Sequence, residues 1–220
     1  MITRLFRLER DMAQEQYYDE VGELNLTTSV EVEPGTLAMY AAHVPDAPQT
    51  CYVFEVYADE GAYDAHVASD HFGAFVEMAG KVLTGREVIS VVPRLMLEKP
   101  GTLRVIGGEV EPHLVCVDVK PGAGEEFFAA ASANMRAAVE AEPGVLVMYA
   151  TTRADDPDRW VFWEVYASAE AYAAHREARH FKDYLAATES LIEGKEFHVL
   201  AADVLVSKGS LRHDGEADER

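Results

Sequence analysis

Apolar and polar residues alternate in some short segments of the chain and recur at helical spacing in others. Residues 3–9 alternate with a period of two, which is typical of a half-buried strand. Residues 14–30 then carry Tyr17, Tyr18 and Val21 at the spacing of one helix face. The pattern therefore predicts that the chain opens with a strand and continues into a helix.

A hairpin and a capped helix are predicted next. The Glu-Pro-Gly sequence at 33–35 ends the first helix, because proline and glycine do not continue one. Residues 36–43 and 50–57 read as two strands that are joined by a polar Pro-Asp loop. Asp59 follows and can cap a helix over 60–68, since its carboxylate would accept from free backbone N–H groups.

A second short helix and a long strand complete this series of elements. Residues 70–83 have helical character and Gly85 follows them. Residues 86–99 form a long apolar segment that we interpret as a strand. The resulting order, β-α-β-β-α-β, is that of the ferredoxin-like fold.

The same series occurs twice in the chain. The stretch EVYADEGAYDAHVASDHF at 55–72 returns as EVYASAEAYAAHREARHF at 164–181, always 109 positions later. The register extends without a gap from 31–99 to 140–208. Solenoid repeats are only about 20–50 residues long. We therefore predict two domain-sized modules rather than a solenoid.

The second copy and the flanking segments set the expected boundaries. Residues 113–119 predict a strand, and the Ala-rich stretch 125–140 predicts a helix. The expected organisation is a first module at 1–99, a linker at 100–109, a second module at 110–208 and a disordered acidic tail at 209–220.

The predicted element order leaves helices on only one face of each four-stranded antiparallel sheet. The bare face carries enough apolar residues to need burial, and the sheet of the sister module is the simplest cover. We therefore expect an α+β protein of two tandem ferredoxin-like modules packed sheet to sheet as an intrachain dimeric α/β-barrel. This would be an intrachain pseudo-dimer, and a further homodimer is compatible with it.

Charge and composition narrow the range of partners. The formal net charge is −20, which argues against nucleic acid and anionic membrane, because both need clustered Lys and Arg. No apolar run approaches the ~18 residues of a membrane span, and the first residues lack the apolar core of a signal peptide. A cytoplasmic protein is expected. Cys51 and Cys116 occupy non-equivalent positions and predict buried thiols rather than a disulfide.

Several of these features together resemble the antibiotic biosynthesis monooxygenase family. They are the Glu-Pro-Gly turn, a third strand containing a glutamate, and the paired motifs Ala65-His66 and His71-Phe72, which return as Ala174-His175 and His180-Phe181. The motif pair is most similar to the quinol monooxygenase branch and departs from the anthrone branch, where an Asn and a Trp are expected in the pocket. The resemblance implies dimeric α/β-barrel proteins, among them oxygenases that use no cofactor.

Two pairs of residues are candidates for catalysis. His66 and His175 each stand three residues after a tyrosine on one helix face, where a neutral imidazole could take a proton from a phenol. A hydrogen-bonded core histidine is the alternative. Glu55 and Glu164 lie mid-strand between apolar neighbours, a costly place for a carboxylate unless it is paired or lines a cavity. A Glu–His pair would orient the imidazole, whereas an interface carboxylate would be structural.

Further residues are candidates for contacting the substrate. The expected set is Tyr40 and Tyr149 as hydrogen-bond donors, with His71, His180, Phe72, Phe181 and Trp163 nearby. Trp163 and Trp160 occur only in the second copy, where the first has Phe54 and Cys51, so the two pockets, if both exist, are not equivalent. Which module is active stays open. The His-x4-His spacing is not that of helical zinc ligands, no third ligand is seen to repeat, and no metal site is expected.

The expected chemistry follows from the resemblance and from the motifs present. The chain has no Gly-rich dinucleotide fingerprint and no P-loop. Oxygen chemistry without a cofactor requires the substrate to supply the electrons, as a deprotonated quinol or anthrone can. The resemblance thus implies a cofactor-independent monooxygenase of a small electron-rich aromatic that uses O2. A non-oxidative enzyme, isomerase-like, or a small-ligand binder on the same fold is one alternative, and a haem-binding relative is another.

Overall fold

The computed structural model describes residues 1–215, and these fall into two compact units. Unit 1 contains residues 1–90, 101–108 and 200–209. Unit 2 contains residues 91–100, 109–199 and the described chain from residue 210 on. Each unit therefore combines one sequence module with short segments that are distant in the sequence.

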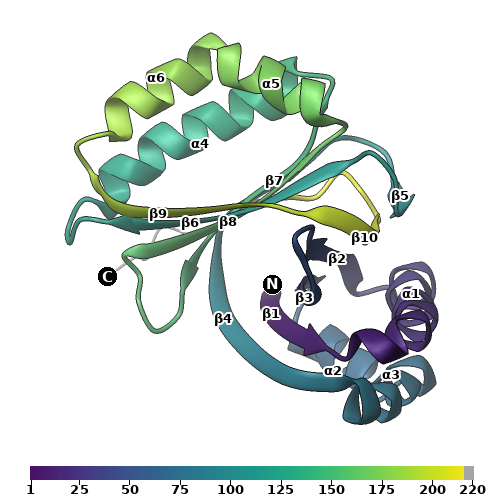
Figure 1. The fold of residues 1–220 in the computed structure, drawn as a ribbon. Helices are drawn as coiled ribbons and strands as arrows, with labels where there is room; N and C mark the ends of the chain where they lie inside the picture. Colours follow the sequence, from purple (N-terminus) through teal and green to yellow (C-terminus); the bar gives the residue numbers. More distant parts are fainter. Residues whose placement is uncertain (216–220) are drawn as a thin grey trace. The chain divides into compact units, whose positions relative to one another are not determined.

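Unit 1 has an antiparallel sheet with helices on one face (Figure 1). Its elements are β1 (Ile2–Arg10), the short 3-10 helix η1 (Met12–Gln14), α1 (Glu15–Val32), β2 (Thr36–Val44), β3 (Ala47–Tyr57), α2 (Glu60–Val67), α3 (Asp70–Val82), the first half of β4 (Leu83–Glu98), β5 (Leu103–Ile106) and β10 (Ala201–Ser207). The strand order is β5-β10-β2-β3-β1-β4. Helix α1 packs on α3 and on the sheet strands β2 and β10.

Unit 2 repeats this arrangement. Its elements are the second half of β4, β6 (Glu111–Val119), α4 (Gly124–Ala141), β7 (Val145–Arg153), β8 (Arg159–Tyr166), α5 (Ala169–Glu177), α6 (Arg179–Thr188), β9 (Ile192–Val199) and β11 (Arg212–Asp214). The strand order is β11-β4-β7-β8-β6-β9. Helices α4, α5 and α6 lie on one face of this sheet (Figure 1). Both units thus have the predicted β-α-β-β-α-β core, and the chain is an α+β protein of two ferredoxin-like modules.

The last predicted strand of each module is divided between the two units. Strand β4 pairs with β1 up to Ser90, and from Val91 on it pairs with β7. In the second copy the predicted strand is interrupted at Leu200, and its end, β10, pairs with β2. Periodicity predicts where a strand lies but not which edge accepts it, so this exchange was not visible in the sequence.

Two short edge strands lie in the predicted linker and in the predicted disordered tail. The predicted linker contains β5, which pairs with β10. The predicted disordered tail contains β11, which pairs with β4, so disorder is the wrong expectation for 212–214. Strands of three or four residues are too short to show periodicity, and their stability comes from the neighbouring strand. The rest of the predicted tail, 216–220, lies outside the described residues.

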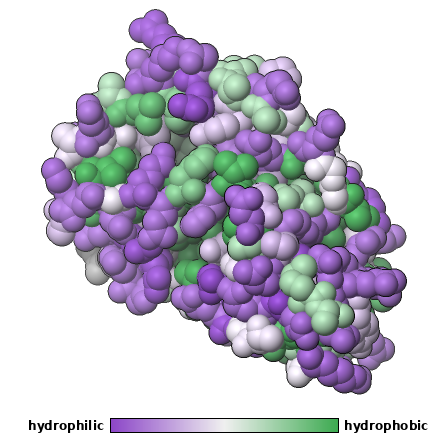
Figure 2. All heavy atoms as spheres, in the orientation of Figure 1, coloured by the Kyte–Doolittle hydropathy of each residue, from purple (hydrophilic) through white to green (hydrophobic). Residues whose placement is uncertain are grey.

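Hydrophilic residues dominate the visible surface (Figure 2). Hydrophilic side chains cover most of the face in Figure 2, in keeping with the net charge of −20. Within residues 1–215, no helix is both long and apolar enough to cross a membrane. Both cysteines are free thiols. Cys51 is buried, as predicted, whereas Cys116 is only partly buried.

The glycine of each Glu-Pro-Gly turn is required by a close approach between elements. A Cβ atom on Gly35 would lie 2.3 Å from the Cβ of Ala62 on α2, and one on Gly144 would lie 2.5 Å from the Cβ of Ala171 on α5. Such distances are far below van der Waals contact. The helix after the hairpin can therefore pack on the turn only when the turn residue has no side chain.

We predict that Gly35→Ala destabilises the protein by about 1–3 kcal/mol, the usual cost of overpacking. The free energy of unfolding from urea denaturation measures the effect. Gly73→Ala is the matched control, since a Cβ there meets nothing within 4 Å and alanine favours the helix α3 by up to about 1 kcal/mol. Equal stability of Gly35→Ala and wild type would show that the turn can move away from α2 freely.

Candidate functional site

A cavity of about 720 Å³ lies in unit 1, between helices α1 and α3 and the sheet. Most of its wall is apolar and includes Phe6, Leu26, Val53, Phe72 and Phe75. Its polar lining includes Tyr18, Asn25, Glu55, Tyr63, Arg86 and Asp203. An apolar hollow with a few polar groups is the usual form of a small-molecule site.

Glu55 is the buried carboxyl group of this cavity. It projects from β3, is 8% exposed, and its Oε2 accepts a hydrogen bond of 2.9 Å from the Tyr57 hydroxyl. Burial raises the pKa of Glu55 to about 7, because the charged form is poorly solvated. The Tyr57 hydrogen bond and the nearby Arg4 and Arg86 lower it in part, and Glu33 raises it. A carboxyl with this pKa can both accept and release a proton near neutral pH.

Asp203 brings a second carboxyl to the cavity. It lies in β10, and its Oδ1 is 2.6 Å from Nδ1 of His43 on β2. Its Oδ2 is buried and has no hydrogen-bond partner among residues 1–215. Burial raises the pKa of Asp203, and the nearby His43 lowers it in part. Sequence reasoning missed Asp203, because only the pairing of β10 with β2 brings it into unit 1.

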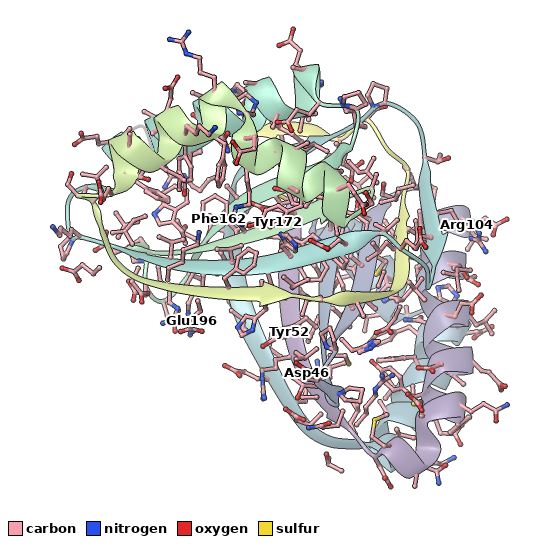
Figure 3. The ribbon with its side chains drawn as sticks, turned by 45° about the horizontal axis from the view of Figure 1, so that its top comes forward. Asp46, Tyr52, Arg104, Phe162, Tyr172 and Glu196 are labelled. Carbon is pink, nitrogen blue, oxygen red and sulfur yellow. The ribbon has the colours of Figure 1, made fainter. Side chains whose placement is uncertain are left out.

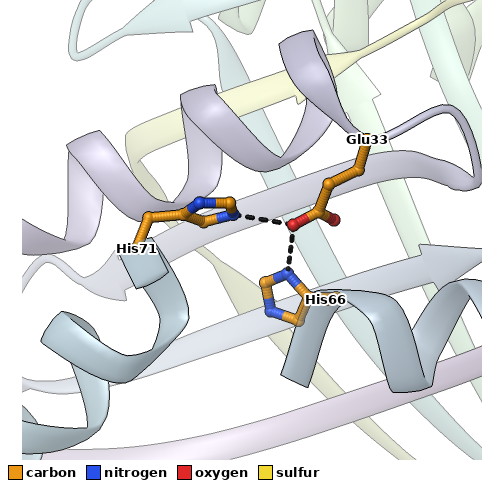
Figure 4. Close-up of side chains that lie close together, drawn as sticks. All are labelled: Glu33, His66 and His71. Carbon is orange, nitrogen blue, oxygen red and sulfur yellow. Dashed lines mark hydrogen bonds and ion pairs between the residues drawn. The ribbon is translucent and has the colours of Figure 1, made fainter. Parts of the chain in front are cut away.

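A cluster of one glutamate and two histidines lies beside the cavity (Figure 4). Oε1 of Glu33 is 3.2 Å from Nδ1 of His66 and 2.7 Å from Nε2 of His71. Nδ1 of His66 is also 3.3 Å from the Ser29 hydroxyl oxygen. His66 is 1% exposed, and its burial lowers the pKa of its ring, which Glu33 raises in part. We call these three residues the first Glu-His-His cluster.

Unit 2 has the same cluster. Oε1 of Glu142 is 2.8 Å from Nδ1 of His175 and 3.0 Å from Nε2 of His180. Nδ1 of His180 is 2.7 Å from Oδ1 of Asn134 on α4. This second Glu-His-His cluster stands 109 positions after the first. Both clusters join the end of the long helix to the two short helices.

The clusters correct two sequence interpretations. The carboxylate that holds His66 is Glu33, whereas Glu55 accepts a hydrogen bond from Tyr57. The statement that no third ligand repeats is also wrong, because Glu33 and Glu142 repeat with both histidines. The Glu-Pro-Gly motif was interpreted as a helix end and as a family feature, and no partner was assigned to its glutamate. Its glutamate, present in both copies, was the signal that could have revealed the cluster.

The predicted substrate-contacting residues of unit 1 have different surroundings. Phe72 lines the cavity, and its ring centroid lies 4.8 Å from that of His66. His71 belongs to the first cluster. Tyr40 is fully buried on β2 and is not part of the cavity lining. His66 itself is not in the lining either, so Glu55 is the predicted catalytic residue that faces the hollow.

Their counterparts in unit 2 are buried or partly buried within that unit. The Tyr149 hydroxyl donates to Glu98 Oε1, and the Tyr166 hydroxyl donates to Glu164 Oε2 at 2.9 Å. Phe181 packs against His175 with 4.7 Å between ring centroids, and Trp163 is fully buried. Contacts within unit 2 thus account for six predicted residues: Tyr149, Glu164, His175, Phe181, Trp163 and His180.

Large aromatic side chains occupy the part of unit 2 that corresponds to the cavity. Phe127, Phe128, Trp160 and Phe162 stand at the positions of Tyr18, Asp19, Cys51 and Val53 in unit 1. Trp160 lies 5.3 Å from Phe127 and stacks on Phe128 at 5.5 Å between centroids. Phe162, labelled in Figure 3, belongs to the same core cluster. The two modules are therefore not equivalent, as the sequence predicted.

The fold is that of a two-module ferredoxin-like protein, with a cavity in unit 1. The sequence profile of the antibiotic biosynthesis monooxygenase family matches residues 1–78 and 114–187. The chain belongs to this family, and both modules carry the match.

Solved structures show the same tandem form. The putative monooxygenase of Lactobacillus acidophilus NCFM is 30% identical, with a TM-score of 0.91, over 97% of this chain and 99% of that one. The putative monooxygenase FN1347 of Fusobacterium nucleatum is 24% identical, with a TM-score of 0.88, over 97% of both chains. An anthrone oxidase-like protein shares the fold at 13% identity and a TM-score of 0.55, over 96% of this chain and 94% of that one. No curated protein sequence matches the chain.

Proposed function

We propose that the protein is a monooxygenase that oxidises a small electron-rich aromatic, of the quinol or anthrone type, in the cavity of unit 1. The observation that carries the proposal is Glu55, a buried carboxyl with a pKa of about 7 in an otherwise largely apolar hollow. Family membership supports the reaction class. The cavity walls, which include Phe72 and Phe75, suit an aromatic ring.

In this mechanism Glu55 accepts the proton of a substrate hydroxyl. The resulting anion gives electrons to O2 far more readily than the neutral phenol does. For a quinol the balance is one quinol plus one O2 giving one hydroxyquinone and one water. The substrate loses four electrons, one oxygen atom enters the product, and the other leaves as water. All four electrons come from the substrate, so no redox cofactor enters the balance.

Other cavity residues have supporting roles in the proposal. Asp203 and its partner His43 can bind a second hydroxyl, as in a quinol, because Asp203 Oδ2 has no other hydrogen-bond partner among residues 1–215. His66 acts indirectly as a positioning residue: its ring packs on Phe72, which lines the cavity. The catalytic base that we propose is thus Glu55 rather than His66. Glu164, His175 and the other residues of unit 2 take no part in this reaction.

The test is oxygen uptake by the full chain with a panel of quinols and anthrones under ¹⁸O2. We expect one O2 consumed per product and one ¹⁸O atom in each product molecule. Turnover or tight binding of the same compounds without O2 consumption would instead establish the non-oxidative function and overturn the proposal.

A pair of variants locates the reaction. We predict that Val53→Phe lowers turnover at least about 10-fold, because the added ring occupies the space in which the substrate must be positioned. Phe162→Val makes the reverse change at the equivalent position of unit 2 and should keep the rate per folded molecule. Equal rates for Val53→Phe and wild type would place the reaction outside this cavity.

A further inference from the structure

We propose that each unit binds one divalent transition-metal ion of the zinc type in its Glu-His-His cluster. The ligands would be Glu33, His66 and His71 in unit 1, and Glu142, His175 and His180 in unit 2. The inference goes beyond the monooxygenase proposal and does not depend on it, since the ligand residues do not line the cavity.

The ligand atoms of each cluster are already close enough for one ion. In each cluster the three atoms lie within 4.8 Å of one another. The oxygen-to-nitrogen distances are 2.7 and 3.2 Å in unit 1 and 2.8 and 3.0 Å in unit 2. Bonds of about 2.0–2.1 Å separate ligand atoms by about 2.9–3.4 Å around a six- or four-coordinate ion. A small outward shift of each side chain would therefore admit the ion.

The hydrogen bonding of unit 2 points to a positive charge between the side chains. Nδ1 of His180 must carry its proton, because Oδ1 of Asn134 can only accept. In a neutral ring Nε2 then presents a lone pair to Glu142 Oε1 at 3.0 Å. Two lone pairs at this distance repel each other unless a cation or an extra proton lies between them. A ligand histidine held through its other nitrogen is also the usual arrangement at metal sites.

Unit 1 has further oxygen atoms around the same position. The Ser29 hydroxyl donates to the carbonyl of Asn25 at 2.6 Å, so its oxygen can only accept from the His66 side. Nδ1 of His66 thus faces two acceptor oxygens, those of Ser29 and Glu33. Glu33 Oε2 accepts from the Thr36 hydroxyl, which fixes the direction of the carboxylate. His66 Nδ1 is therefore either the proton donor to these two oxygens or, with Glu33, a ligand of a cation that takes the place of that proton.

Charge and ligand type favour a zinc-like ion. With neutral histidines each cluster carries one negative charge in a largely buried setting, since Glu33 and Glu142 side chains are 11% and 17% exposed. A divalent ion compensates this charge. Two imidazoles and one carboxylate form a ligand set that suits zinc and related transition metals, with a further position left for water. Calcium and magnesium prefer oxygen ligands and should bind poorly.

The test uses the purified full chain, stripped with a chelator and titrated with Zn²⁺ by calorimetry. We expect two ions per chain at micromolar affinity or tighter, and no comparable binding of Mg²⁺. Co²⁺ should bind in the same ratio and produce visible absorption from coordinated imidazole. These readouts need no enzymatic activity, so failure of the monooxygenase proposal would leave them unaffected.

Variants assign the ions to the clusters. His71→Ala should weaken binding at one site by about 100-fold or more while the other ion stays bound, and His180→Ala should do the same for the other site. His198→Ala removes a histidine outside both clusters and should keep two ions. If the stripped wild type binds no Zn²⁺, the clusters hold a shared proton only, and the proposal is overturned. If the wild type binds only one ion, the histidine variant that still binds it identifies the unit without a metal site. The proposal is then overturned for that unit.

Discussion

Replacing Glu55 by glutamine is expected to lower turnover by about 100-fold to 10,000-fold, the usual contribution of a positioned general base. Glutamine keeps the shape of the side chain and can accept the Tyr57 hydrogen bond through its amide oxygen. It cannot take up the substrate proton. The rate of O2 uptake at saturating quinol measures the effect, and binding of the quinol to the variant separates loss of chemistry from loss of affinity.

Glu164→Gln is the matched control. It changes the equivalent residue of unit 2, which accepts from Tyr166 as Glu55 accepts from Tyr57. The aromatic core of unit 2 occupies the space that would correspond to the cavity. Activity of Glu164→Gln should therefore stay near that of wild type. If Glu55→Gln retained full activity while Glu164→Gln lost it, the reacting carboxyl would lie in unit 2.

The raised pKa of Glu55 fixes the direction in which activity and stability should change with pH. The catalytic form of Glu55 is the carboxylate, so wild-type activity should rise with pH through about 7. Stability should change in the opposite direction. Because the pKa of Glu55 is raised from 4.5 to about 7, its contribution to stability is complete below 4.5 and is lost as pH rises through about 7. Glu55→Gln should therefore gain stability relative to wild type over this range.

Much of the fold could be read from local patterns. The duplicated stretch, the alternating segments and the Glu-Pro-Gly turns all predict two β-α-β-β-α-β modules, and the structure has them. The N-cap role of Asp59 is also confirmed, since its carboxylate accepts from Ala62 N at 2.8 Å. These features depend on neighbours in the sequence, which is why one sequence suffices to predict them.

The candidate site depended on contacts between distant residues. Asp203 reaches the cavity only because β10 pairs with β2, and a strand pattern does not specify its partner. Glu33 meets His66 and His71 only when α1 packs beside α2 and α3. The sequence does carry a signal that distinguishes the unit with the cavity from the other unit. Trp160 and Phe162 replace Cys51 and Val53, but their size decides nothing until all four are known to face the helices.

We predict that Trp160→Ala lowers the free energy of unfolding of unit 2 by about 3–5 kcal/mol, as expected for a fully buried aromatic side chain. Trp160 stacks on Phe128 and contacts Phe127 and Phe162, and Arg94 lies 5.2 Å from the centre of its ring. Removing the indole leaves a large apolar space that these rigid neighbours can fill only in part. Cys51→Ala, at the same position of unit 1, deletes one atom and should cost far less.

Urea denaturation followed by the fluorescence of Trp163 measures this loss in the unit where it occurs, because both tryptophans lie in unit 2. Trp160→Phe should recover most of the stability, since Nε1 of Trp160 has no hydrogen-bond partner among residues 1–215 and deleting it breaks no bond. The new apolar space in Trp160→Ala should also bind benzene-sized ligands and be stabilised by them. A loss below about 1 kcal/mol, without such binding, would mean that α4 and α6 close over the space. The difference between the two units would then lie in helix packing rather than in the size of this side chain.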